Sequence, residues 1–130
     1  MAGGREPWET ATTVRLKAER NGAAVAQRAH IARSWHQRMV GLLAHDKLPP
    51  DEAMIFPGCS SIHTIGMRFP IDVIFVNREW RIVSLQEGLG AGRLVLPVRG
   101  AWGVVETASG TLKRTGLQVG DRLVVISGTA

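Results

Sequence analysis

Residues Ile71–Val76 read IDVIFV, and this short run decides the fold class. Because side chains alternate along an extended backbone, both faces of a strand at this position are apolar. One face carries Ile71, Val73 and Phe75, and the other carries Ile74, Val76 and the single acid Asp72. A strand with two apolar faces belongs inside a sheet. The run therefore predicts a central strand with one acid near the edge of the core.

The flanking sequence repeats this strand pattern. Alternation begins at Thr12, and Asn21-Gly22 then predicts a hairpin, because both residues tolerate positive φ. Glycine and proline separate the further runs that have strand composition. These runs occupy residues 23–31, 53–56, 62–65, 81–85, 93–96, 102–106 and 121–126.

One short α-helix is predicted over residues 34–44. Ser34 can cap its first turn, Gln37 completes a capping box, and apolar residues recur at helical spacing after it. A single helical turn is expected near residues 111–115. Many short strands with so little helix predict a mainly β fold, a compact single-domain β-barrel or sandwich.

Length and composition indicate one domain, which we place at residues 12–130 behind a flexible tail over residues 1–11. One cysteine excludes an internal disulfide, and no apolar run approaches the ~20 residues that span a bilayer. The first residues lack the apolar centre of a secretory signal, so a cytoplasmic location without membrane contact is expected. The net charge of +5 hints at acidic partners, although dispersed arginines are typical of a solvated surface.

Cys59 and His63 are four residues apart and raise the question of a reactive pair. In a helix their β-carbons would lie about 6 Å apart, close enough to cooperate. In a strand, four residues at roughly 3.3 Å each separate them by about 13 Å. The β-branched Ile62, Thr64 and Ile65 favour the extended form. Cys59 is therefore interpreted as a partly buried thiol at a loop-to-strand junction, either structural or reactive.

A metal site is not expected from this sequence. Structural metals need three or four ligands, and His30, His36 and His45 are isolated along the chain. No catalytic residue and no cofactor is predicted either.

Asp72 is the most informative polar residue. A buried carboxylate is costly unless it is paired or well hydrogen-bonded. Asp72 could cap the turn over residues 68–70 or anchor a neighbouring arginine, or it could line a polar pocket. Its candidate partners are Arg38, His63, Arg68 and Arg81.

Four segments together resemble a small prokaryotic family, the domain-of-unknown-function family 192. They are RMVGLL (38–43), MIFPGCSSIHTIGMRFPIDVIFVN (54–77), VVETASG (104–110) and GLQVGD (116–121). The resemblance runs in order over about residues 13–127, and it implies a compact, β-rich single domain with no established activity. By the family's motifs, the characteristic positions fall on Arg38, Asp72, Glu106, Gly120 and Asp121.

This chain departs from the family's pattern at two places. Many members have a run of tryptophan, methionine, lysine, asparagine and threonine ahead of the aspartate, where this chain has HTIGM (63–67). Many also have glycine in the hairpin after that strand, where this chain has Trp80. A role for the lysine–asparagine pair therefore does not carry over.

Three kinds of function remain open, and the sequence favours the first. The favoured function is a small binding module with a polar pocket at strand ends, which takes an unknown small molecule or peptide. Its candidate pocket residues are Arg38, His63, Asp72 and Glu106.

The second function is nucleic-acid binding through a basic stripe on the first hairpin, made of Arg15, Lys17, Arg28 and His30. Its weakness is the lack of aromatic residues for base stacking. The third is a hydrolase-like enzyme that uses Asp72 and Glu106 as acid and base near His63. The sequence favours a non-enzyme over this third function.

Overall fold

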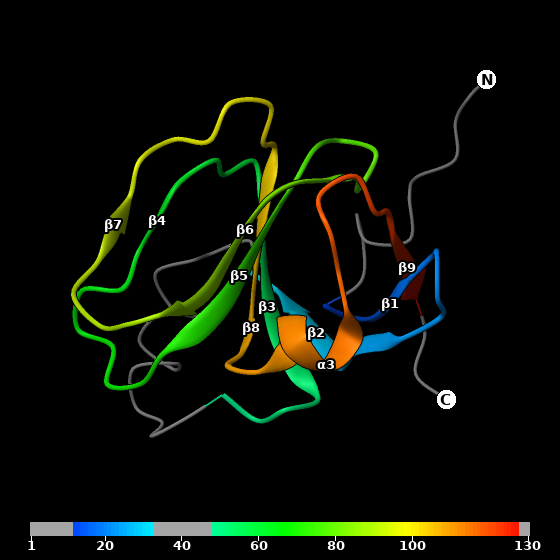
Figure 1. The fold of residues 1–130 in the computed structure, drawn as a ribbon, viewed down its shortest axis with the longest axis horizontal. Coiled ribbons are helices and arrows are strands. Elements are labelled where there is room, and N and C mark those ends of the chain that lie inside the picture. The colour runs from blue at the N-terminus through cyan, green and yellow to red at the C-terminus, as the bar shows by residue number, and fades with distance from the viewer. Residues whose placement is uncertain (1–11, 33–47, 128–130) are drawn as a thin grey trace.

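A curled seven-stranded sheet, a half-barrel, forms the body of the computed structural model (Figure 1). The structure describes residues 12–32 and 48–127. The expected tail over residues 1–11, the predicted helix over 34–44 and Arg38 lie outside the described residues.

Each strand and the helical turn predicted within the described residues is present, with bounds that differ from the predicted ones by a few residues. The strands are β1 (Thr13–Ala18), β2 (Ala24–Ile31), β3 (Glu52–Pro57), β4 (Ile62–His63), β5 (Ile71–Val76), β6 (Ile82–Leu89), β7 (Leu94–Val95), β8 (Gly103–Ala108) and β9 (Leu123–Ser127), and the helix α3 (Thr111–Thr115) precedes the last of them. The mainly β class and the helical turn near 111–115 are thus confirmed.

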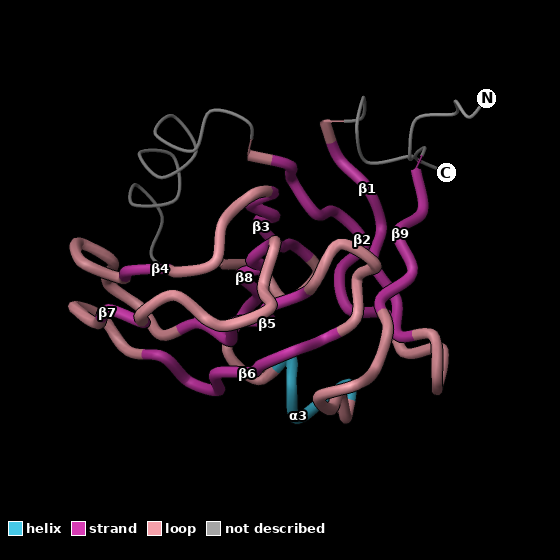
Figure 2. The backbone as a smooth tube through the Cα atoms, turned by 90° about the horizontal axis from the view of Figure 1, so that it is seen from above, coloured by secondary structure: helices cyan, strands magenta, loops and turns pink. Residues whose placement is uncertain are grey.

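The main sheet has the order β6-β5-β8-β3-β2-β1-β9, and β4 pairs with β7 in a separate ribbon. Only the pairing of β2 with β3 is parallel among these neighbours. Figures 1 and 2 show the β4–β7 ribbon at the opposite end of the molecule from β1 and β9. The core strands β5, β8 and β3 lie between these two ends.

Two hydrophobic clusters lie on the two faces of β5, as the alternation of IDVIFV predicts. Ile74 and Val76 belong to one cluster, which also contains Leu112 of α3. Ile71, Val73 and Phe75 belong to the other, which contains Phe56 and Val104. Each fully buried aliphatic or phenyl side chain contributes about 1.5–3 kcal/mol of transfer free energy. The prediction of an interior strand with two apolar faces is confirmed.

The predicted hairpin at Asn21-Gly22 forms, but its turn is wider than two residues. The amide of Gly22, which has φ 71°, donates to the carbonyl of Ala18 at 2.9 Å. Asn21 keeps negative φ, and its side chain instead donates to the carbonyl of Thr115 at 2.9 Å. The predicted hairpin is therefore present, with positive φ at Gly22 only and with the Asn21 side chain held by the end of α3.

A guanidinium–carboxylate pair fastens this hairpin to the entry of β9. Arg20 donates from Nε and Nη2 to the two carboxylate oxygens of Asp121, at 2.9 and 3.0 Å. The backbone amide of Gln118 also donates to that carboxylate. The hydrogen bonds from Arg20 lower the pKa of Asp121 below its ordinary value. Asp121 of the Gly-Asp motif therefore stabilises the turn that leads into β9, and it also links this turn to the hairpin between β1 and β2.

Trp80 occupies a backbone conformation that usually selects glycine. Its φ is 65°, at the position where the family resemblance places a glycine. The side chain is nevertheless buried, and its ring meets Trp102 edge-to-face, with centroids 5.9 Å apart. An L-residue in this region costs about 1–2 kcal/mol, and the packing of the indole compensates for that cost.

Two substitutions of Trp80 separate the two effects. W80A and W80G should both lower the free energy of unfolding by about 3 kcal/mol, because each removes a buried indole. W80G should be the more stable of the two by about 1 kcal/mol, because glycine adopts positive φ without strain. At most positions a variant with glycine is less stable than the same variant with alanine. If urea denaturation gave W80A a higher free energy of unfolding than W80G, backbone strain at Trp80 would be contradicted.

Candidate functional site

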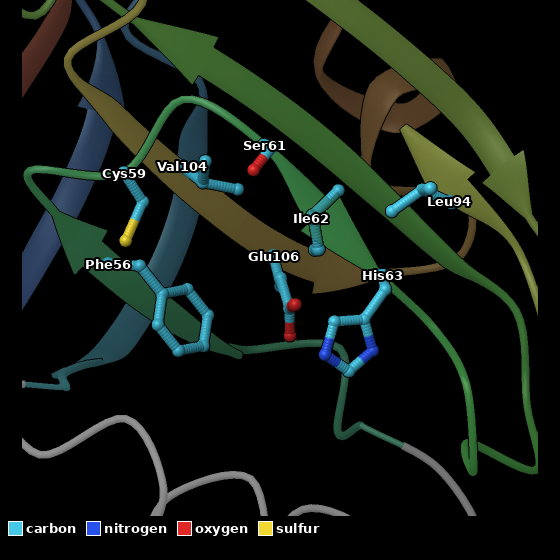
Figure 3. A pocket seen from close by; sticks show the side chains of 8 residues that line it. All are labelled: Phe56, Cys59, Ser61, Ile62, His63, Leu94, Val104 and Glu106. Atoms are coloured by element: carbon cyan, nitrogen blue, oxygen red, sulfur yellow. The ribbon is translucent and has the colours of Figure 1, made fainter. Parts of the chain in front are cut away.

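A cavity of about 240 Å³ opens between the sheet and the segment that leads into β4 (Figure 3). One wall comes from β3 and β8, and the other from residues 59–63 together with β7. The lining residues are Phe56, Cys59, Ser61, Ile62, His63, Leu94, Val104 and Glu106.

Strand pairing brings the sheet wall together. Phe56 of β3 is the direct partner of Val104 on β8, and Met54 is the partner of Glu106. Because side chains alternate along a strand, Val104 and Glu106 point to the same face of the sheet. That face is otherwise apolar, so Glu106 projects from the middle of a hydrophobic cluster.

Glu106 is the unusual group of this cavity. Its side chain is 1% exposed, and neither of its carboxylate oxygens has a hydrogen-bond partner among the described residues. Burial without a counter-charge disfavours the ionised form and raises the pKa of Glu106 to about 8. The side chain is therefore mostly neutral at pH 7. Figure 3 shows its carboxyl group pointing into the cavity, as His63 does.

Cys59 and His63 line the same cavity but do not form a close pair. The backbone between them contains no helix, as the β-branched residues predicted. Figure 3 shows the two side chains apart, with Glu106 between them. Burial raises the pKa of the Cys59 thiol above its ordinary value, which works against thiolate formation.

Alkylation of Cys59 is therefore expected to be slow. With iodoacetamide at pH 8, modification should proceed roughly five- to tenfold more slowly than that of free cysteine, because both thiolate fraction and access are reduced. Because Cys59 is the only cysteine in the sequence, a C59S variant measures any modification at residues other than cysteine. A rate at or above that of free cysteine would show an activated thiol instead.

The structure places Asp72 away from this cavity. Its carboxylate accepts hydrogen bonds from the amides of Gly88, Gly110 and Leu112, at 2.8, 3.1 and 2.9 Å. Gly110 precedes α3 and has no side chain with which to cap it, so Asp72 supplies the capping oxygen from β5. Within residues 12–32 and 48–127, the side-chain oxygens of Asp72 are held by these three amides rather than by the turn over 68–70 or by an arginine, and the candidate partner Arg38 lies outside those residues.

Asp72 and Glu106 lie on opposite faces of the sheet. On the neighbouring strands β5 and β8, Asp72 pairs with Thr107, whereas Glu106 pairs with Val73. Adjacent residues of a strand point to opposite faces, so the sheet separates the two carboxylates. The acid–base pair considered for a hydrolase is not formed. Of the four candidate pocket residues, the structure brings together His63 and Glu106, while Arg38 lies outside the described residues.

The candidate basic stripe does share the outer face of the sheet. Arg15 and Lys17 alternate with the buried residues of β1, and His30 of β2 pairs with Thr13 on the same face. Lys17 and Arg28 are exposed, whereas His30 contacts an acid, with its Nε2 2.8 Å from Oε1 of Glu52. Glu52 therefore interrupts the positive charge of the stripe.

Sequence reasoning missed most of the cavity wall. Phe56, Ser61, Ile62, Leu94 and Val104 look like ordinary strand and loop residues when read singly. The pairing of β4 with β7 brings Leu94 near His63, its direct partner, and no local pattern marks that contact.

Two further observations limit what this part of the chain can do. Within residues 12–32 and 48–127, no three histidine, cysteine, aspartate or glutamate side chains lie close enough to share a metal ion. No helix among those same residues is long and apolar enough to cross a membrane.

Comparisons with known proteins agree with the fold. The family described as "Uncharacterized ACR", domain-of-unknown-function family 192, matches residues 16–125. A UPF0127 protein of Pyrococcus furiosus is 39% identical over 64 residues, which cover 49% of this chain and 54% of the relative. The chain thus spans about half the length of the curated relative that it matches.

Two crystal structures have a similar fold at 22% sequence identity. One is a "putative transcription regulator" from Sinorhizobium meliloti 1021, with a TM-score of 0.74 over 94% of this chain and 98% of that one. The other is a protein of unknown function from Novosphingobium aromaticivorans, with a TM-score of 0.73 over 95% and 93%. At this level of identity the likeness concerns the fold alone.

Proposed function

The chain belongs to domain-of-unknown-function family 192, a family with no established activity, and we propose that it is a small ligand-binding module. The observation that carries this proposal is Glu106, a buried carboxyl group without a described hydrogen-bond partner that faces a cavity. A buried polar group left unsatisfied is costly, and a bound ligand can supply the missing partner.

The cavity fits a small molecule with an apolar body and one polar group. Its volume of about 240 Å³ is below the ~300–1,000 Å³ of pockets that take drug-sized ligands. Phe56, Ile62 and Val104 offer the apolar contacts, and Glu106 offers one polar contact that orients the ligand. This combination of apolar walls with few polar groups is typical of ligand pockets.

A fragment screen by protein NMR tests this proposal. Small aromatic and aliphatic compounds should shift the amide signals of the lining residues and should slow the alkylation of Cys59. The variant L94W should block the cavity, since Leu94 lines it and its exposed side chain leaves room for substitution. The control L96W changes an equally exposed leucine that does not line the cavity, and it should bind as the wild type does.

Fragments that shift no lining residue, or that bind equally well to L94W and the wild type, would remove the support for a binding module.

We also propose a cytoplasmic location, since an unpaired thiol such as Cys59 suits a reducing compartment. Cell fractionation with an antibody to the chain is the direct measurement, and recovery in an oxidising compartment would contradict it.

A further inference from the structure

We propose that the ligand of this cavity is a small primary amine, whose ammonium group pairs with Glu106 while its hydrocarbon part lies against Phe56 and Val104. This inference rests on the proposed function and names the chemical class of the ligand.

The charge balance of the cavity is the first argument. Glu106 is the one acid among the eight lining residues that the structure describes, and none of these eight is a lysine or an arginine. The groups around it on the sheet are apolar: Met54 and Val73 are its strand partners, and both are buried. The other titratable groups of the lining are Cys59 and His63, on the opposite wall. The described lining therefore offers Glu106 no lysine or arginine as a partner, and in this proposal the positive charge comes from the ligand.

The chemistry of a carboxyl group is the second argument. A neutral donor on the ligand would gain an ordinary hydrogen bond, whereas an ammonium gains a charge-assisted one, which is roughly twice as strong. The free-energy cost of removing the Glu106 carboxyl group from water is mostly met when the chain folds, so ligand binding does not have to meet it again. A primary ammonium has three N–H donors, enough for both oxygens of Glu106 and a further acceptor such as the hydroxyl of Ser61. The face of Phe56 also attracts a cation within about 6 Å.

Binding should then release a proton. Glu106 is mostly neutral at pH 7 because its pKa is about 8, and pairing with an ammonium requires it to ionise. The amine itself stays protonated, so close to one proton leaves per ligand bound. Affinity should therefore fall roughly tenfold for each pH unit below 7, and it should level off above pH 8.

Benzylamine and benzyl alcohol form a matched pair of probes, alike in size and different in charge. NMR titrations of the full chain at pH 6, 7 and 8 give the two affinities, and calorimetry in phosphate and Tris buffers gives the protons released. Benzylamine should bind at least tenfold more tightly than benzyl alcohol at pH 8, with the pH slope described above. E106Q should remove both the preference and the slope, whereas E87Q, which changes an exposed glutamate, should retain both.

The possible outcomes separate the two proposals. If benzyl alcohol shifts the lining residues with an affinity equal to that of benzylamine, the amine inference is overturned and the binding module stands. If benzylamine binds without proton release, or binds E106Q equally well, the inference is overturned as well. If neither probe nor any screened fragment binds at the cavity, the binding module itself fails. The comparison of probes on the wild-type chain needs no variant to fold.

Discussion

Replacing Asp72 by alanine is expected to lower the free energy of unfolding by about 3–5 kcal/mol. The carboxylate is fully buried and accepts three backbone hydrogen bonds, from Gly88, Gly110 and Leu112. Alanine would leave the buried amide of Leu112 and the part-buried hydrogen-bonding sites of Gly88 and Gly110 without this acceptor, and a buried donor without a partner costs about 1–3 kcal/mol. Urea denaturation followed by circular dichroism measures the change.

Two further variants refine the interpretation of Asp72. D72N keeps the shape but replaces one acceptor oxygen with an amide donor, so it should cost about 2–3 kcal/mol. D51A changes an exposed aspartate and should stay within about 0.5 kcal/mol of the wild type. If D72A were as mild as D51A, the amides would have to find other partners, and the structural role of Asp72 would be refuted.

Replacing Glu106 by glutamine is expected to remove a pH dependence of stability. The pKa of Glu106 is raised to about 8 in the folded chain, from 4.5 as an ordinary side chain. Below pH 4.5 both folded and unfolded chains hold this proton. Between pH 4.5 and 8 the unfolded chain has released the proton while the folded chain keeps it, so stability falls as the pH rises. The loss over this window is on the order of 4 kcal/mol.

The measurement is the difference in unfolding free energy between wild type and E106Q across pH 4.5–8.5. The variant should gain stability relative to the wild type as the pH rises, because glutamine stays neutral. E87Q makes the same formal change of charge at the surface and should follow the wild type. A difference between wild type and E106Q that is constant with pH would mean that the carboxyl group of Glu106 is not desolvated.

Local patterns in the sequence predicted the strands closely, since alternation and turn residues act over a few neighbours. The run IDVIFV was sufficient to predict an interior strand with two apolar faces, and Gly22 marked the first hairpin. No local pattern shows that the Asn21 side chain of this hairpin is held by Thr115, which is 94 residues away in the chain.

The candidate site was only partly predictable. His63 and Glu106 were predicted to line a polar pocket at strand ends, and both line the cavity. Asp72 was predicted for the same pocket as Glu106. Their strands are neighbours, and the register between β5 and β8 sends the two carboxylates to opposite faces.

The sequence by itself determined the class of fold, the positions of most strands and the two-sided burial of β5, because a period of two in hydrophobicity is a local property. Tertiary structure alone decided which acid is satisfied by backbone amides and which one faces a cavity. The physical reason is that hydrogen-bond partners and cavity walls come from segments far apart in the chain. The register that joins β3, β5 and β8 depends on the burial of all of them together.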